Sequence, residues 1–134
     1  MKLIDFDLSN YPIIVAKSNP IQANESNCIG NMADLEMQLR SIKDEKAIMI
    51  FDLTHAKYMS GDVRLQYGNW VKKSEKLFTD KLICVILVNK SAIMNMVIKG
   101  VMLIQKLPVP MYIIPTIEEA VELANKTLSE AIPV

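Results

Sequence analysis

The chain has 134 residues, 51% of them hydrophobic, and its 15 Lys and Arg balance 15 Asp and Glu. This length fits a single domain over residues 1–134. The apolar content is too high, and the charge too balanced, for a disordered chain. A net charge of zero also argues against a dedicated nucleic-acid binder, which normally carries a strong basic footprint.

Cysteine usage and the apolar runs indicate where the protein works. Cys28 and Cys84 are far apart, and no CxxC pair is present, so the chain has no disulfide framework of a small secreted domain. The N-terminal residues lack the ~7–15 apolar residues of a signal peptide. The most apolar stretch, 93–107, falls short of the ~20 residues that span a bilayer. We therefore expect a soluble, cytoplasmic protein.

The first half of the chain predicts a hairpin, a helix and a central strand. Residues 11–17 read as a strand, and 21–25 as a short second strand that pairs with it. Ser26 is the expected N-cap of a helix whose apolar residues are spaced by four, three, four and three: Cys28, Met32, Leu35, Leu39 and Ile42. Residues 47–53 are apolar without alternation, as expected for a strand covered on both faces.

The second half continues as alternating helices and strands. A loop over 54–60 leads into one amphipathic helix from Val63 to Phe78, followed by a continuous apolar strand over 82–88. A third helix ends before Pro108, and a short strand covers 111–114. Thr116 and Glu119 have the spacing of a capping box at the start of the last helix.

This order predicts an α/β fold. The sheet is expected to be mainly parallel, with four to five strands and an N-terminal hairpin, flanked by about four helices. In such folds ligands and partners meet the loops at the carboxyl ends of the strands, here 54–62, 89–91 and 115–116.

Motifs for cofactor chemistry are missing. The four glycines are too far apart for a dinucleotide or phosphate loop, and a single histidine, His55, gives no zinc cluster. We expect no cofactor and no metal. Asp52 reads as a strand-end residue that accepts hydrogen bonds in the following turn. A small enzyme remains an alternative only if Asp52, His55 and Ser60 line one pocket.

The turn before the amphipathic helix carries the most information. Either Ser60 or Asp62 can cap the helix, and its N-terminal amides favour an anion. The turn is therefore either a simple cap or a docking loop.

The run from Asp52 to Asp62, DLTHAKYMSGD, resembles the core motif of STAS (SpoIIAA-like) domains, the anti-sigma-factor antagonist family. The resemblance extends to Arg64 early in the helix and Trp70 further on, and covers about 47–128. It implies a SpoIIAA-like fold and a protein-binding use of Ser60, Gly61, Asp62 and Arg64. The family's Asp-Ser-Ser positions fall on Ser60, Gly61 and Asp62, so the phospho-acceptor serine is replaced by Asp62.

Charge is unevenly distributed despite the balance. Residues 57–106 hold nine basic residues against three acidic ones. This is either a set of solvated helix faces or a basic face for an acidic partner or an anionic membrane.

The helix over 91–106 is more apolar than one sheet face requires. Met94, Ile98 and Met102 form a line beside a second apolar line, wider than the usual ~100° stripe. These side chains belong either to the core or to an exposed contact surface.

These observations favour a non-enzymatic regulatory domain that binds a protein partner or forms a homodimer. The expected binding residues are Ser60, Gly61, Asp62, Arg64, Met94, Ile98 and Met102. The first alternative is a carrier of an apolar ligand or lipid, or a peripheral membrane module. The second is a small enzyme of unknown reaction.

Overall fold

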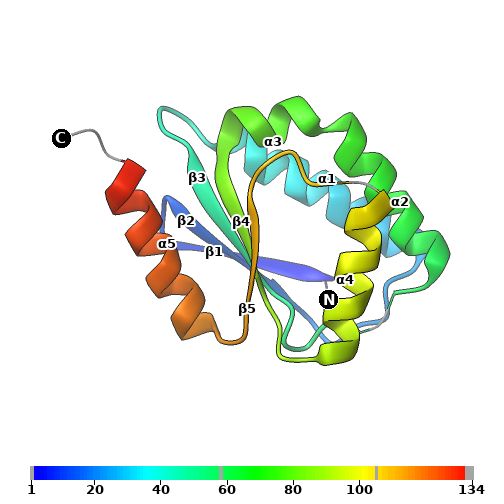
Figure 1. Ribbon diagram of the computed structural model, residues 1–134. Helices are drawn as coiled ribbons and strands as arrows, with labels where there is room; N and C mark the ends of the chain where they lie inside the picture. The colour runs from blue at the N-terminus through cyan, green and yellow to red at the C-terminus, as the bar shows by residue number, and fades with distance from the viewer. Residues whose placement is uncertain (1, 58, 105, 132–134) are drawn as a thin grey trace.

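The computed structural model describes residues 2–57, 59–104 and 106–131 (Figure 1). These residues form one five-stranded sheet and five helices, in the order β1 Ile4–Asn10, β2 Ile13–Ser18, α1 Glu25–Ser41, β3 Ala47–Asp52, α2 Gly61–Lys73, α3 Glu75–Lys81, β4 Leu82–Val88, α4 Ala92–Ile104, β5 Met111–Ile114 and α5 Ile117–Ala131. The predicted α/β class is confirmed. None of the described helices is both long enough and apolar enough to cross a bilayer.

The strands lie in the sheet in chain order, β1-β2-β3-β4-β5. Only β1 and β2 are antiparallel, and the other three pairs are parallel. Because each parallel crossover moves one strand in the same direction, right-handed connections place the linking helices on one face. Figure 1 shows this arrangement, with α1 to α4 on one side of the sheet and α5 on the other.

Each sheet face has its own apolar core. On the α5 face, Ala120 and Ala124 are fully buried against the sheet, where Ile48 and Ile86 are fully buried too. On the opposite face, Met49 packs with residues of α1 and α3. Burial on both faces explains why β3 and β4 are apolar without alternation.

The predicted hairpin forms, but from different strands. β2 pairs with β1, which precedes it, and residues 21–25 form no strand; they connect β2 to α1 and contribute the first residue of that helix. The prediction of a strand over 21–25 is therefore wrong. In β1 the apolar residues Ile4, Phe6 and Leu8 alternate with polar ones, which is the pattern of an edge strand with one solvated face.

Two helix boundaries also differ from expectation. The N-cap of α1 is Asn24, not Ser26. Asn24 Oδ1 accepts from the Asn27 backbone N–H (2.9 Å), and Asn27 Oδ1 accepts from the Asn24 backbone N–H (2.7 Å). The helix expected from Val63 to Phe78 is interrupted at the buried Ser74, whose N–H donates to two carbonyls of α2. The described residues therefore form five helices rather than about four.

Candidate functional site

A cavity of about 260 Å3 lies between the sheet and the helices on its α1–α4 side. Its wall is almost entirely apolar and combines strand, helix and loop residues. The sheet contributes Phe51, Leu53, Val85, Leu87 and Met111; α2 and α3 contribute Trp70, Val71 and Phe78. The space is partly open to solvent, as a binding pocket is, and not a closed void in the core.

Helix α4 forms one side of this cavity. Met94, Val97, Ile98 and Met102 all line it, and all four are half-buried. Among the described elements, α4 has its backbone neighbours mainly in α2. The four side chains named above reach the cavity from the helix side.

The start of α4 is held in place by hydrogen bonds. The Ser91 hydroxyl accepts from the Met94 backbone N–H (3.1 Å), and the Asn89 side chain donates to Asn95 Oδ1 (2.7 Å). Asn89 directly follows β4 and is itself buried. These contacts fix the first turn of α4 at the carboxyl edge of the sheet and so position Met94 in the cavity wall.

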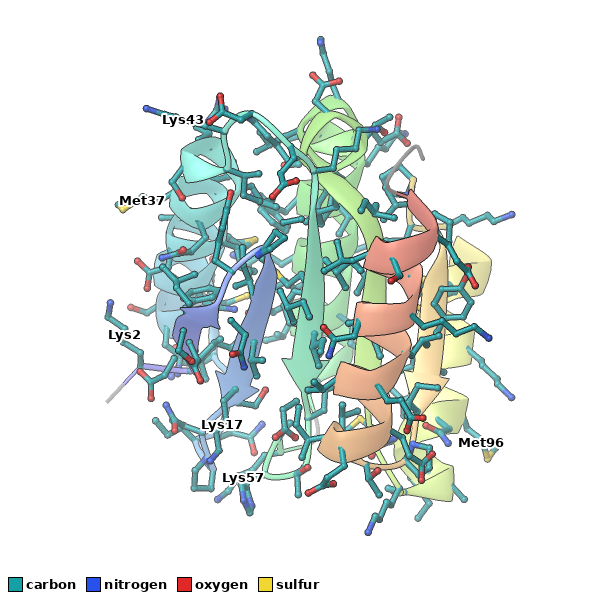
Figure 2. All side chains as sticks on the ribbon, turned by 90° about the vertical axis from the view of Figure 1, so that its left-hand side faces the viewer. Lys2, Lys17, Met37, Lys43, Lys57 and Met96 are labelled. Carbon is teal, nitrogen blue, oxygen red and sulfur yellow. The ribbon has the colours of Figure 1, made fainter. Side chains whose placement is uncertain are left out.

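The opposite side of the same turn faces solvent. Ile93 and Met96 each expose 73% of their surface, and Met96 projects away from the body of the molecule (Figure 2). Helix α4 therefore has an apolar side in the cavity wall and a second apolar side in water. These two apolar sides explain why the apolar stripe of this helix is wider in the sequence than one sheet face requires.

The predicted binding residues occupy two separate places. Met94, Ile98 and Met102 come together in the cavity wall, whereas Ser60, Gly61 and Asp62 are exposed at the start of α2. Ser60 is the N-cap, with its Oγ 3.4 Å from the Val63 backbone nitrogen. Arg64 is half-buried one residue further along that helix. Among the described residues of this loop, Ala56, Lys57 and Met59 reach the cavity, and the turn itself does not.

Sequence reasoning overlooked a polar pair in the cavity wall. Asn31 of α1 is only 5% exposed, and its Nδ2 donates to the hydroxyl oxygen of Tyr67 in α2 at 2.5 Å. Burial raises the pKa of the Tyr67 hydroxyl, and it also raises the pKa of the neighbouring Cys28 thiol. The sequence did indicate that Asn31 is buried: it follows Cys28 by three residues and precedes Leu35 by four, which places it on the buried face of α1.

The residues weighed for catalysis do not share a pocket. Asp52 accepts from the Thr54 backbone N–H (3.1 Å) and from its hydroxyl (2.5 Å), which confirms the expected turn at the strand end. His55 and Ser60 are exposed, and none of the three lines the cavity. Within 2–57, 59–104 and 106–131, no three His, Cys, Asp or Glu side chains are grouped to hold a metal ion.

Comparison with known proteins assigns no family to the chain. No protein-family model, curated protein or solved structure matches it.

Proposed function

We propose that this protein is a non-enzymatic binding domain that holds an apolar small molecule between its sheet and helix α4. The observation that carries the proposal is the cavity of about 260 Å3 with its nearly continuous apolar wall. An engineered protein cavity of about 150 Å3 with such a wall stays dry and binds benzene. An empty apolar space lowers stability through lost contacts, and a ligand that fills it restores them.

The composition of α4 suits this role. Methionine side chains are unbranched and polarizable, so they adapt to ligands of irregular shape. Met59, Met94, Met102 and Met111 contribute to the wall from three segments of the chain: the loop before α2, helix α4 and strand β5. A wall with this much methionine can close around an apolar molecule without a fixed shape of its own.

Trp70 provides a direct test. It is the only tryptophan in the chain and lines the cavity, so its fluorescence reports on occupancy. A brominated alkanol such as 10-bromodecan-1-ol quenches indole emission on contact. We expect saturable quenching at micromolar concentrations. Linear, non-saturating quenching equal to that of free tryptophan would refute ligand binding at this site.

Two substitutions on α4 sharpen that experiment. Met94→Phe adds bulk to the cavity wall, and we expect it to weaken binding at least tenfold. Met96→Phe makes the same chemical change on a side chain that is 73% exposed, and we expect an unchanged dissociation constant. Equal effects of the two variants would contradict binding inside the cavity.

The outer side of α4 favours a second candidate function, contact with an anionic membrane. Ile93 and Met96 are exposed there, and Lys90 and Lys99 on either side of them are exposed as well. Apolar side chains flanked by lysines are typical of helices that lie in a bilayer interface. Such a contact would bring the cavity close to a source of apolar ligand.

Vesicle co-sedimentation tests this second candidate. We expect binding to vesicles of phosphatidylglycerol and little binding to phosphatidylcholine. Met96→Asp should release the protein, whereas Met37→Asp, on α1 and 66% exposed, should have no effect. Figure 2 shows Met37 and Met96 at well-separated positions on the molecule, which makes them a matched pair. Membrane binding that both variants retain would exclude this surface.

The STAS resemblance supports a protein contact at the start of α2. Gly61 and Asp62 are exposed there and free of the sheet, as a docking turn requires. A pull-down with Asp62→Lys tests it. An unchanged set of associated proteins with this variant and with Met94→Asp would argue against a protein-binding function.

A further inference from the structure

One part of the cavity wall is polar. Asn31 and Tyr67 face the same space from α1 and α2, and the hydrogen bond between them joins the two helices. The other residues of the wall are mostly aliphatic, aromatic or methionine. Ser18, Asn19 and Lys57 are the other polar residues of the described wall. A polar pair in a mainly apolar wall fixes the orientation of a ligand, because an apolar surface cannot distinguish one end of a molecule from the other.

The side chain of Asn31 can make more than one hydrogen bond. A side-chain amide has two N–H donors and a carbonyl oxygen with two lone pairs. In the part of the chain that the structure describes, one N–H of Asn31 donates to Tyr67, and Oδ1 is not among the sealed polar atoms that lack a partner. Asn31 is 5% exposed and lines the cavity, so a ligand donor in the cavity meets its amide with little competition from bulk water.

Tyr67 supplies the complementary group. Its oxygen accepts from Asn31, which leaves the phenol O–H as a donor towards either Cys28 or the cavity. A phenol with a raised pKa stays protonated through neutral pH and keeps that donor. With the O–H turned towards the cavity, the pair offers one acceptor and one donor at the same place, both uncharged.

We infer that Asn31 and Tyr67 form a subsite for a neutral hydroxyl group, so that the ligand is an apolar molecule carrying an alcohol. A hydroxyl both donates and accepts, which matches Asn31 Oδ1 and the Tyr67 O–H. This inference rests on the proposed function and adds the ligand class.

A carboxylate fits this subsite poorly. Lys57 is the only charged residue among the described residues of the wall, and it is exposed in the loop between β3 and α2. An anion beside Asn31 would be buried without a cation, which is strongly unfavourable. An acidic ligand would place its head group at Lys57 instead, and its binding would not depend on Asn31.

Three probes with one skeleton separate these cases: naphthalene, 2-naphthol and 2-naphthoate, titrated calorimetrically into the full chain at pH 7. We expect 2-naphthol to bind about 3- to 10-fold more tightly than naphthalene, which corresponds to the net value of about one hydrogen bond. Asn31→Leu should abolish this preference while naphthalene still binds. Tyr67→Phe should reduce it. Asn69→Leu, an exposed position on α2, should preserve it.

The outcomes distinguish the subsite from the cavity. If naphthalene binds but 2-naphthol has no advantage, or keeps its advantage in Asn31→Leu and Tyr67→Phe, the subsite is wrong and the cavity stands. Tightest binding of 2-naphthoate, lost in Lys57→Ala, would also overturn the subsite. Failure of all three probes would refute both proposals. Circular dichroism of each variant confirms its fold, and Tyr67→Phe keeps the test decisive if Asn31→Leu does not fold.

Discussion

At the N-terminus of α1, two polar residues two positions apart have different roles. Asn24 is tied to Asn27 by reciprocal hydrogen bonds, whereas Ser26 lies exposed inside the first turn. We predict that Asn24→Ala lowers the free energy of unfolding by about 1 kcal/mol, the usual value of an N-cap. Ser26→Ala should change it by less than about 0.5 kcal/mol. Urea denaturation measures both, and the reverse order would contradict this capping assignment.

Tyr67 makes stability depend on alkaline pH. Burial raises the pKa of its hydroxyl in the folded state, so the unfolded chain loses this proton first as pH rises. Its contribution to stability is complete below the unfolded pKa of about 10 and is lost as pH rises from there towards the folded pKa. Above pH 10 we expect wild-type stability to fall more steeply than that of Tyr67→Phe, by up to about 1.4 kcal/mol per pH unit. If urea denaturation at a series of pH values gave the same slope of stability against pH for wild type and Tyr67→Phe, the burial of this hydroxyl would be contradicted.

At the scale of elements, α4 and α5 are attached to the sheet in different ways. Ala120 and Ala124 bring α5 into direct contact with the sheet, whereas α4 stands over the cavity on half-buried side chains. We predict faster amide hydrogen exchange in α4 than in α5 without ligand, and slower exchange in α4 once an apolar ligand is present. Exchange measured by mass spectrometry tests both statements. An α4 as protected as α5 in the free protein would mean that the cavity does not weaken its attachment.

The elements also show how far the sequence predicts the structure. β3 and β4 were predicted correctly because burial on both faces leaves a continuous apolar run. β1 was missed: no strand was assigned before residue 11, although Ile4, Phe6 and Leu8 alternate with polar residues. The line of Met94, Ile98 and Met102 indicated an unusual helix, but spacing alone cannot measure the distance between α4 and the sheet. The cavity depends on that distance, and therefore only the three-dimensional structure reveals it.

For the whole molecule, ligand binding and stability are linked. A ligand that binds only the folded state, at a free concentration 100 times its dissociation constant, adds about 2.7 kcal/mol to the free energy of unfolding. In a domain of this size each kcal/mol raises the melting temperature by about 4 °C. We therefore expect saturating 2-naphthol to raise it by about 10 °C in wild type and by much less in Met94→Phe. A ligand-independent melting temperature in wild type would argue against a ligand inside the fold.

Nine methionines allow the cavity to be located most directly. In protein labelled with 13C at the methionine methyl groups, we predict that 2-naphthol shifts the NMR signals of Met59, Met94, Met102 and Met111, which line the cavity. The signals of the exposed Met37 and Met96 should stay in place. Shifts confined to Met37 and Met96, or no saturable shift at any methionine, would contradict a ligand-binding cavity beneath α4.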